Sequence, residues 1–264
     1  LAQICKLNWS YYKPIVIAAA FSCVVGQPLI AAIFMLEVFA KTSAEQKIFS
    51  TIMAWVGFLV MQSLGIKSLF SIIQVDLTAG FWDKMWVVIV IGLTVGLLTN
   101  LFKRGYHSLS TFFKKHKLIA VLTIFILSGI FIQPSMKAFH SFSLDTFISI
   151  QNGQANFQFI ILKMLFTLFF VSLGFIGGDF VPAIAIGSAT GVYVAQYFQV
   201  NFTFGLAMGL MAFFTGLTRL KWTSLWIIFF LTGFKVTLWA YLCLSIARQF
   251  SGSQSLYKKE LKLS

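Results

Sequence analysis

An aspartate next to two glycines and close to a proline interrupts an otherwise apolar part of the chain. The residues from Leu173 to Tyr193 read LGFIGGDFVPAIAIGSATGVY. Gly177 and Gly178 can adopt backbone angles that are closed to other residues. Pro182 fits the first turn of a helix, where its missing N–H leaves no hydrogen bond unmade. The pattern predicts a loop followed by a helix that begins near Val181.

Such a helix start has the chemistry of an anion site. The N–H groups of Asp179, Phe180 and Val181 would have no partner within the helix, and the positive end of the helix dipole would lie behind them. Helix N-termini of this kind attract anions. The alternative is a bent helix whose glycines serve packing only.

Asp179 has three possible roles at this position. An acid at membrane depth is costly and is therefore a functional candidate. It could be protonated through desolvation and handle protons, pair with a cation, or cap the helix by accepting from first-turn N–H groups. Glu37, in PLIAAIFMLEV, is the other acid in an apolar stretch. We expect Glu37 to be a polar-loop or interhelical anchor rather than a proton carrier.

The composition identifies the elements around these residues as membrane helices. Hydrophobic residues make up 59% of the 264 residues and charged residues 10%, whereas soluble domains have about 45–50% and about 25%. The mean hydropathy is +0.89. A soluble fold of this size could not bury so much apolar surface, so we predict an all-α integral membrane protein.

The positive charge of the chain fits a membrane better than a nucleic acid. The formal net charge is +13, and basic residues cluster at the ends of apolar runs, as in Lys103-Arg104, Lys114-Lys115-His116-Lys117 and Lys258-Lys259. Such clusters are typical of cytoplasmic loops and of contacts with anionic headgroups. We predict a multi-pass protein of the plasma (inner) membrane that binds no nucleic acid.

The apolar stretches are short or interrupted for membrane-spanning helices, which need about 20 residues. Broken helices whose N-termini face an anion near the midplane are a device of transporters and channels. A polar segment after residue 132 is predicted to form interfacial helices and a loop. The predicted stretches are 15–39 with a break at 26–28, 48–64, 85–102, 118–132, 159–175, 182–198, 204–217 and 223–246.

No pattern of residues indicates an enzyme, a metal site or a cofactor. The motifs H-E-x-x-H and G-x-S-x-G are absent from the sequence, and no carboxylates pair at short spacing. The three cysteines are widely spaced and form no C-x-x-C pair. We therefore predict no enzymatic activity, no metal and no cofactor.

Three motifs in order resemble the CLC family of chloride channels and anion/proton antiporters. AAAFSCVVGQPLIAAIFMLEV resembles the family's A-F-x-x-P-L-A-G-x-x-F-x-x-E helix pair, GGDFVPAIAIGSATG its G-x-F-x-P segment, and FSGSQSLYKK its closing G-x-x-x-Y segment. Together they cover nearly the whole chain. The resemblance implies one transmembrane domain over residues 1–264, a CLC-type bundle of tilted, partly broken helices with inverted-repeat architecture. It also implies a homodimer in which each subunit has its own anion pathway.

The resemblance also implies which residues bind the anion. In the family, main-chain N–H groups at the start of the G-x-F-x-P helix hold the central anion, and these correspond to Phe180 and its neighbour Asp179. The closing tyrosine, here Tyr257, contributes a hydroxyl. Amides and a phenol donate without a formal positive charge, so binding stays weak enough for release.

The chain departs from the family pattern in two respects. It begins after the place of the G-R-E-G-P gating glutamate and lacks the G-S-G-I-P segment, so we expect the N-terminal third of the family subunit to be absent. Val38 follows Glu37 where chloride/proton exchangers of the best-known type carry a second glutamate. This argues against that exchanger mechanism and fits either channels or the fluoride-exporting branch.

Further features resemble the fluoride/proton branch. Asp179 is a shortened version of the acid in its G-G-E-x-x-P motif, and FFTGLTRLKWTSL resembles its F-A-G-A-T-N-T-P-L-A. Lys221 stands where proline is expected, and Val181 where the branch often has threonine. We favour fluoride/proton antiport, with protons as a partner, over chloride transport. A truncated, transport-incompetent protein or a non-conducting partner subunit is the alternative of a different class.

Overall fold

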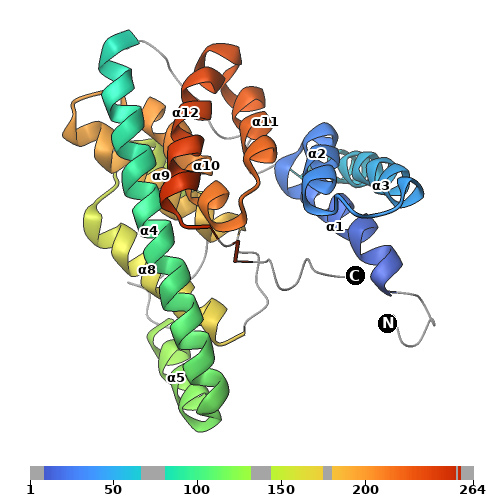
Figure 1. The fold of residues 1–264 in the computed structure, drawn as a ribbon, viewed down its shortest axis with the longest axis horizontal. Coiled ribbons are helices and arrows are strands. Elements are labelled where there is room, and N and C mark those ends of the chain that lie inside the picture. Colours follow the sequence, from blue (N-terminus) through green and yellow to red (C-terminus); the bar gives the residue numbers. More distant parts are fainter. Residues whose placement is uncertain (1–8, 67–80, 132–143, 175–179, 254, 257–264) are drawn as a thin grey trace. The chain divides into compact units, whose positions relative to one another are not determined.

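A computed structural model of the chain describes residues 9–66, 81–131, 144–174, 180–253 and 255–256. The regular secondary structure of these residues is entirely α-helical (Figure 1). The chain divides into two compact units. Unit 1 comprises residues 1–74, 220–233 and 257–264, and unit 2 comprises residues 75–219 and 234–256.

Unit 1 contains the helices α1 (Trp9–Val25), α2 (Pro28–Val38), α3 (Ala44–Ser63) and α11 (Lys221–Thr232). The predicted break at residues 26–28 is confirmed, because Gly26 has a φ of 72° and Pro28 is the first residue of α2. Small residues allow close packing of α1 against α3. A Cβ atom on Gly57 would lie 2.6 Å from the carbonyl oxygen of Ala19.

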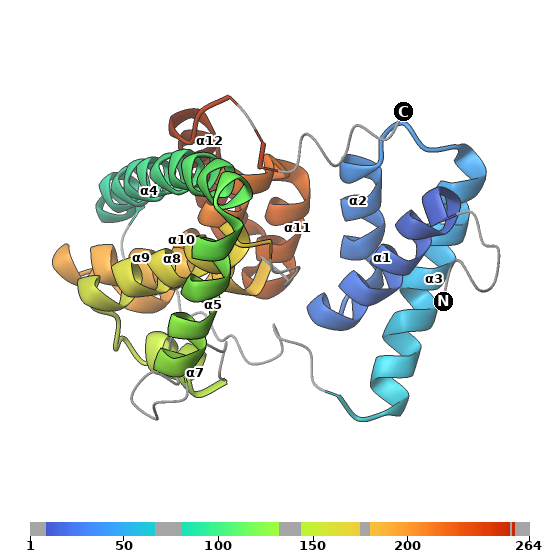
Figure 2. The ribbon, with the colours of Figure 1, turned by 90° about the horizontal axis from the view of Figure 1, so that it is seen from below.

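Unit 2 contains the remaining described helices. The helix α10 is central to it, because every residue from Phe204 to Thr218 is buried. Helices α9, α4 and α12 pack around α10 (Figure 2). The helices are α4 (Phe81–Lys115), α5 (Lys117–Phe131), α7 (Leu144–Gln151), α8 (Phe157–Ser172), α9 (Phe180–Tyr197), α10 (Phe202–Thr218) and α12 (Phe234–Phe250).

Four glycines bring the backbones of α9 and α10 into direct contact. A Cβ atom on Gly187 would lie 2.3 Å from the carbonyl oxygen of Gly209, and one on Gly191 would lie 2.0 Å from that of Gly205. Each helix thus contributes a small-xxx-small pair, which permits the closest approach of two membrane helices. Because the contacts run Gly187 to Gly209 and Gly191 to Gly205, the two helices are antiparallel.

A second glycine pair packs α4 against α12. A Cβ atom on Gly92 would lie 3.0 Å from the carbonyl oxygen of Cys243, and one on Gly96 would lie 3.0 Å from that of Ala247. The Gly92-x-x-x-Gly96 motif therefore makes the close helix contact that its spacing allows. Long helix α4 is fixed to the central part of unit 2 through this contact.

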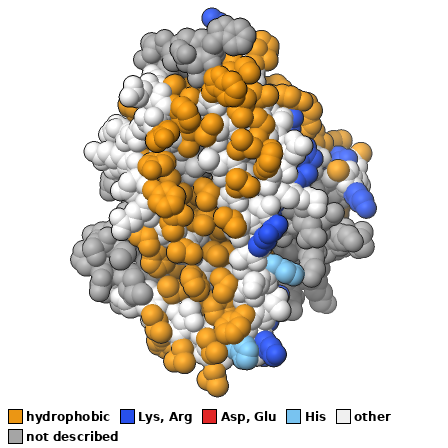
Figure 3. All heavy atoms as spheres, turned by 60° about the vertical axis from the view of Figure 1, so that its left-hand side comes forward, with side chains coloured by type: hydrophobic (Ala, Val, Ile, Leu, Met, Phe, Trp, Pro, Cys, Tyr) orange, Lys and Arg blue, Asp and Glu red, His pale blue; other side chains and the backbone are white. Residues whose placement is uncertain are grey.

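Two of the described helices have the length and composition expected of membrane spans. By length and composition, Met85–Lys115 and Phe180–Tyr197 could cross a membrane, and several shorter apolar helices accompany them. Hydrophobic side chains form a broad band on the face shown in Figure 3, with Lys, Arg and His side chains along one side and at the lower end. Leu97, Leu101 and Phe125 of α4 and α5 are among the exposed apolar side chains.

The structure differs from the predicted stretches in two places. The stretch ending at residue 102 continues as α4 to Lys115, because Lys, Arg and His end an apolar run without ending a helix. The stretch 223–246 is divided into α11 and α12 at Gly233, whose φ of 79° ends α11. A positive φ is open to glycine at little cost, so this residue can end a helix inside a predominantly apolar stretch.

We predict that Gly209→Ala destabilises the protein. The new methyl group would overlap the carbonyl oxygen of Gly187 at 2.1 Å, so the two helices would have to separate. Overpacking of this kind costs about 1–3 kcal/mol. Denaturant unfolding in detergent measures the loss. Gly129→Ala is the matched control, since nothing lies within 4 Å of a Cβ atom at that helical position. Equal stability of the two variants would contradict the close contact.

Candidate functional site

The predicted helix start near Val181 is confirmed, whereas the predicted loop before it lies outside the described residues. Helix α9 begins at Phe180, one residue before the expected start, and Pro182 lies in its first turn. Gly177, Gly178 and Asp179 lie outside the described residues. No acidic residue occurs in the first turn of α9. The positive end of the helix dipole is therefore not neutralised within that turn.

Phe180 is fixed by an aromatic contact with α10. Its ring makes an edge-to-face contact with Phe214, with a centroid distance of 4.9 Å and an interplanar angle of 89°. Phe214 is 5% exposed. Edge-to-face pairs of this geometry are favourable beyond the area that they bury. The first residue of α9 is thereby held against the last two turns of α10.

The glycine contacts place the start of α9 level with the end of α10. Since Gly187 faces Gly209 and Gly191 faces Gly205, the antiparallel register brings Phe180 opposite Gly216. The C-terminal tail reaches the same level. The N–H of Leu256 donates to the carbonyl oxygen of Leu217 at 3.0 Å.

A second hydrogen bond strengthens this attachment of the tail. The hydroxyl of Ser255 donates to the carbonyl oxygen of Thr218 at 3.1 Å. Tyr257, the predicted hydroxyl donor, lies outside the described residues. Leu256, directly before Tyr257, is thus attached to Leu217, which lies one residue beyond Gly216 and the level at which α9 begins.

Cationic and amide side chains hold the turn that leads into the tail. Lys103 Nζ donates to the carbonyl oxygen of Ser251 at 2.9 Å, and Asn100 Nδ2 donates to that of Phe250 at 3.2 Å. Arg219 Nη1 donates to the carbonyl oxygens of Arg248, at 2.9 Å, and of Gly252. These donors satisfy carbonyl groups at the end of α12 that have no partner within the helix. Ser251, at the centre of the turn, is 1% exposed.

Glu37 is an interhelical anchor, as expected. In unit 1 its Oε2 accepts from the N–H and from the hydroxyl of Thr223, both at 2.8 Å, and its Oε1 accepts from the N–H of Trp222 at 3.2 Å. These N–H groups belong to the first turn of α11, where a carboxylate is favoured by the dipole. Glu37 of α2 thus caps α11 from another helix.

Lys163 is a charged residue that sequence analysis did not single out. It lies in α8 and is 3% exposed. A charged residue inside a membrane segment is a functional candidate by default. The signal was present in the sequence, because FQFIILKMLFTLFFVS contains one lysine and no other charge. Among the residues that the structure describes, no three His, Cys, Asp or Glu side chains are grouped as metal ligands would be.

Comparisons with known proteins agree on one family. The family model for voltage-gated chloride channels matches residues 15–252. A protein of Pseudomonas syringae pv. tomato (strain ATCC BAA-871 / DC3000), described as a chloride/fluoride channel protein, is 28% identical over 213 residues. This match covers 76% of the chain and 47% of the relative, so the chain spans about half the length of that relative.

Two solved structures have a similar fold. The crystal structure of a CLC-type fluoride/proton antiporter matches with a TM-score of 0.77 and 23% identity, over 92% of this chain and 63% of that protein. The structure of a slow cyanobacterial Cl−/H+ antiporter matches with a TM-score of 0.67 and 19% identity, over 89% of this chain and 60% of that protein. These matches confirm the all-helical CLC-type fold.

We predict that Glu37→Ala lowers the free energy of unfolding by about 1–3 kcal/mol, because it leaves buried donors without an acceptor. Thr223 is fully buried, so water cannot replace the carboxylate there. Denaturant unfolding measures the change. Glu45→Ala is the control, since the hydrogen bond that Glu45 accepts from Tyr11 is exposed. A Glu37→Ala variant as stable as Glu45→Ala would show that the cap contributes nothing.

Proposed function

The chain belongs to the voltage-gated chloride channel family, and from this premise we propose that it moves halide anions across a membrane. The anion is held at the start of α9 by the main-chain N–H groups of Asp179 and Phe180 and by the hydroxyl of Tyr257. Because the chain spans about half the length of its curated relative, the proposal concerns the activity of the protein at its full length.

One observation carries the proposal: the tail meets the end of α10 at the level where α9 begins. Phe180 contacts Phe214, and the N–H of Leu256 donates to the carbonyl oxygen of Leu217. The residue after Leu256 is Tyr257. This arrangement supports a site in which the tyrosine hydroxyl and the first N–H groups of α9 converge on one ion.

The chemistry of these donors suits transport. Main-chain N–H groups and a phenol replace part of the water around a halide without adding a full positive charge, which keeps the ion exchangeable. The dipole of α9 adds a favourable field at the same point. Pro182 contributes no N–H, so the donors of the first turn are confined to the residues before it.

More specifically, we propose that the protein exchanges fluoride for protons and that Asp179 is the proton-handling residue. The acid follows the glycine pair as in the fluoride branch, and the relatives with similar sequence or fold include a chloride/fluoride channel protein and a fluoride/proton antiporter. Chloride transport is the second candidate, favoured by the similarity in fold to a Cl−/H+ antiporter. Transport in either form involves no chemical conversion.

The remaining parts of the proposal concern assembly and location. We infer a multi-pass protein of the plasma (inner) membrane that functions as a homodimer. Both compact units belong to one transmembrane domain in this proposal, since the family match at residues 15–252 runs across them.

We predict that Tyr257→Phe weakens halide binding about tenfold, because the loss of one donor to a charged acceptor costs about 1.5 kcal/mol. The half-saturating fluoride and chloride concentrations for efflux from liposomes measure this change. Tyr193→Phe is the matched control, because Tyr193 lies in the C-terminal half of α9 and is 39% exposed. Identical half-saturating concentrations in wild type and Tyr257→Phe would remove Tyr257 from the site.

We predict that Asp179→Asn uncouples protons from halide movement while leaving the helix start intact. Asparagine caps helices as well as aspartate does, but it cannot titrate. Fluoride efflux and internal pH, recorded together in liposomes under a proton gradient, measure the coupling. Coupling that survives in Asp179→Asn would assign Asp179 to capping alone.

A further inference from the structure

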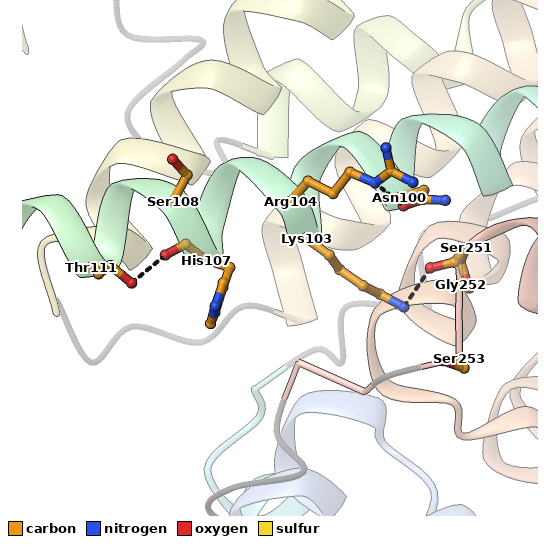
Figure 4. Close-up of a pocket in the computed structure, with 9 residues that line it drawn as sticks. All are labelled: Asn100, Lys103, Arg104, His107, Ser108, Thr111, Ser251, Gly252 and Ser253. Atoms are coloured by element: carbon orange, nitrogen blue, oxygen red, sulfur yellow. Dashed lines mark hydrogen bonds between the residues drawn. The ribbon is translucent and has the colours of Figure 1, made fainter.

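A basic pocket lies in unit 2 between α4 and the turn that follows α12. Its volume is about 770 Å³. Figure 4 shows Lys103 and His107 projecting from the same side of α4, with Lys103 directed toward Ser251. The pocket is lined by Asn100, Lys103, Arg104, His107, Ser108, Thr111, Ser251, Gly252 and Ser253.

The pocket lies where α4 leaves the apolar part of the membrane. From Met85 to Phe102 the helix is apolar and about 27 Å long at 1.5 Å per residue, which matches the hydrocarbon thickness of about 30 Å. The helix then continues from Lys103 to Lys115. This second part of α4 therefore lies at the depth of the lipid headgroups and beyond. The basic residues at the end of α4 indicate that this is the cytoplasmic side of the membrane.

The lining residues are donors of the kind that bind oxyanions. Three of them carry or can carry positive charge, namely Lys103, Arg104 and His107, and the others include hydroxyl and amide groups. None of the nine described lining residues is Asp or Glu. Arg219 adds a fourth cation behind the turn, since it donates to the carbonyl oxygen of Gly252.

The donors are held in place before any ligand arrives. Lys103 Nζ donates to the carbonyl oxygen of Ser251, and Arg104 Nε donates to Asn100 Oδ1 at 3.1 Å. A preordered site loses less side-chain entropy on binding.

We propose that this pocket binds the phosphate group of a phosphate ester. A halide is far smaller than this open pocket of about 770 Å³, whose volume lies in the range of pockets that bind small organic ligands. The side chains of Arg104 and Lys103, together with the hydroxyls of Ser108 and Ser253, match a tetrahedral group that accepts at several oxygens. Basic pockets at the cytoplasmic membrane surface bind phosphorylated lipid headgroups. The ligand is thus a phosphorylated headgroup or a soluble phosphate, and this proposal does not rest on the proposed halide transport.

The test compares two phosphate sources on the full-length protein. Inorganic phosphate is titrated into detergent-purified protein by calorimetry. The protein is then placed in nanodiscs of phosphatidylcholine with or without phosphatidic acid, whose headgroup is a phosphate monoester, and retention of that lipid is measured. Binding in the first experiment identifies a site open to soluble phosphate. Binding of phosphatidic acid alone identifies a lipid headgroup site. Either result supports the proposal.

Two double variants distinguish binding in the pocket from a general effect of positive charge on the protein. Arg104→Gln with His107→Gln removes one arginine and one histidine from exposed positions of the pocket, and binding should weaken about tenfold or more, because hydrogen bonds to a charged group are the strong ones. Lys114→Gln with His116→Gln removes the same two kinds of group, one permanent cation and one histidine, from exposed positions at the end of α4 and directly after it, outside the pocket, and binding should change less than about twofold. Absence of binding by wild type to both sources, or equal weakening in the two double variants, would overturn the proposal.

Discussion

The backbone contact between α9 and α10 is the constraint on which the candidate site depends. Four glycines allow each helix to approach the carbonyl groups of the other, and a single methyl group at any of them would collide with backbone atoms. This contact fixes the register of the two helices. The register in turn brings the first residue of α9 beside the end of α10, where Phe180 meets Phe214 and where the tail is attached.

Few polar residues are available in this apolar chain, and several of them satisfy the ends of its short helices. Backbone groups that have no partner within their helix need partners elsewhere in the protein when they are buried. Glu37 supplies acceptors to the start of α11 in unit 1. In unit 2, Lys103 and Arg219 supply donors to the end of α12 and the following turn. Broken helices are therefore maintained by a small number of charged side chains, each committed to one helix end.

Much of the fold could be predicted from the sequence, because breaks between helices coincide with glycine and proline. The motif GQP predicted the end of α1 and the start of α2, and Pro182 predicted the start of α9 to within one residue. The family was identified from three motifs, and the matching family model confirms it. Other features could not be predicted from hydropathy. Gly233 divides a predominantly apolar stretch into two helices, and α4 continues past Phe102 because basic residues are good helix formers.

The site is less predictable than the fold, because it depends on which distant residues meet. The anchor role of Glu37 was expected, but its partner on α11 lies almost two hundred residues away and emerges only from the structure. From the sequence, the basic residues of α4 indicated only that this part of the chain flanks the membrane. The pocket forms because the turn after α12 folds against these residues. The roles of Asp179 and Tyr257 stay predictions.

The central claim is that the main-chain N–H of Phe180 binds the transported halide, and replacing that N–H alone is its most direct test. Phenyllactic acid introduced at position 180 by nonsense suppression keeps the side chain and replaces the amide by an ester. The account predicts that the half-saturating halide concentration rises about tenfold, as expected for the loss of a donor to an anion. The same replacement at Phe202, the first residue of α10, should leave it unchanged. An unaltered halide affinity with the ester at position 180 would contradict the account.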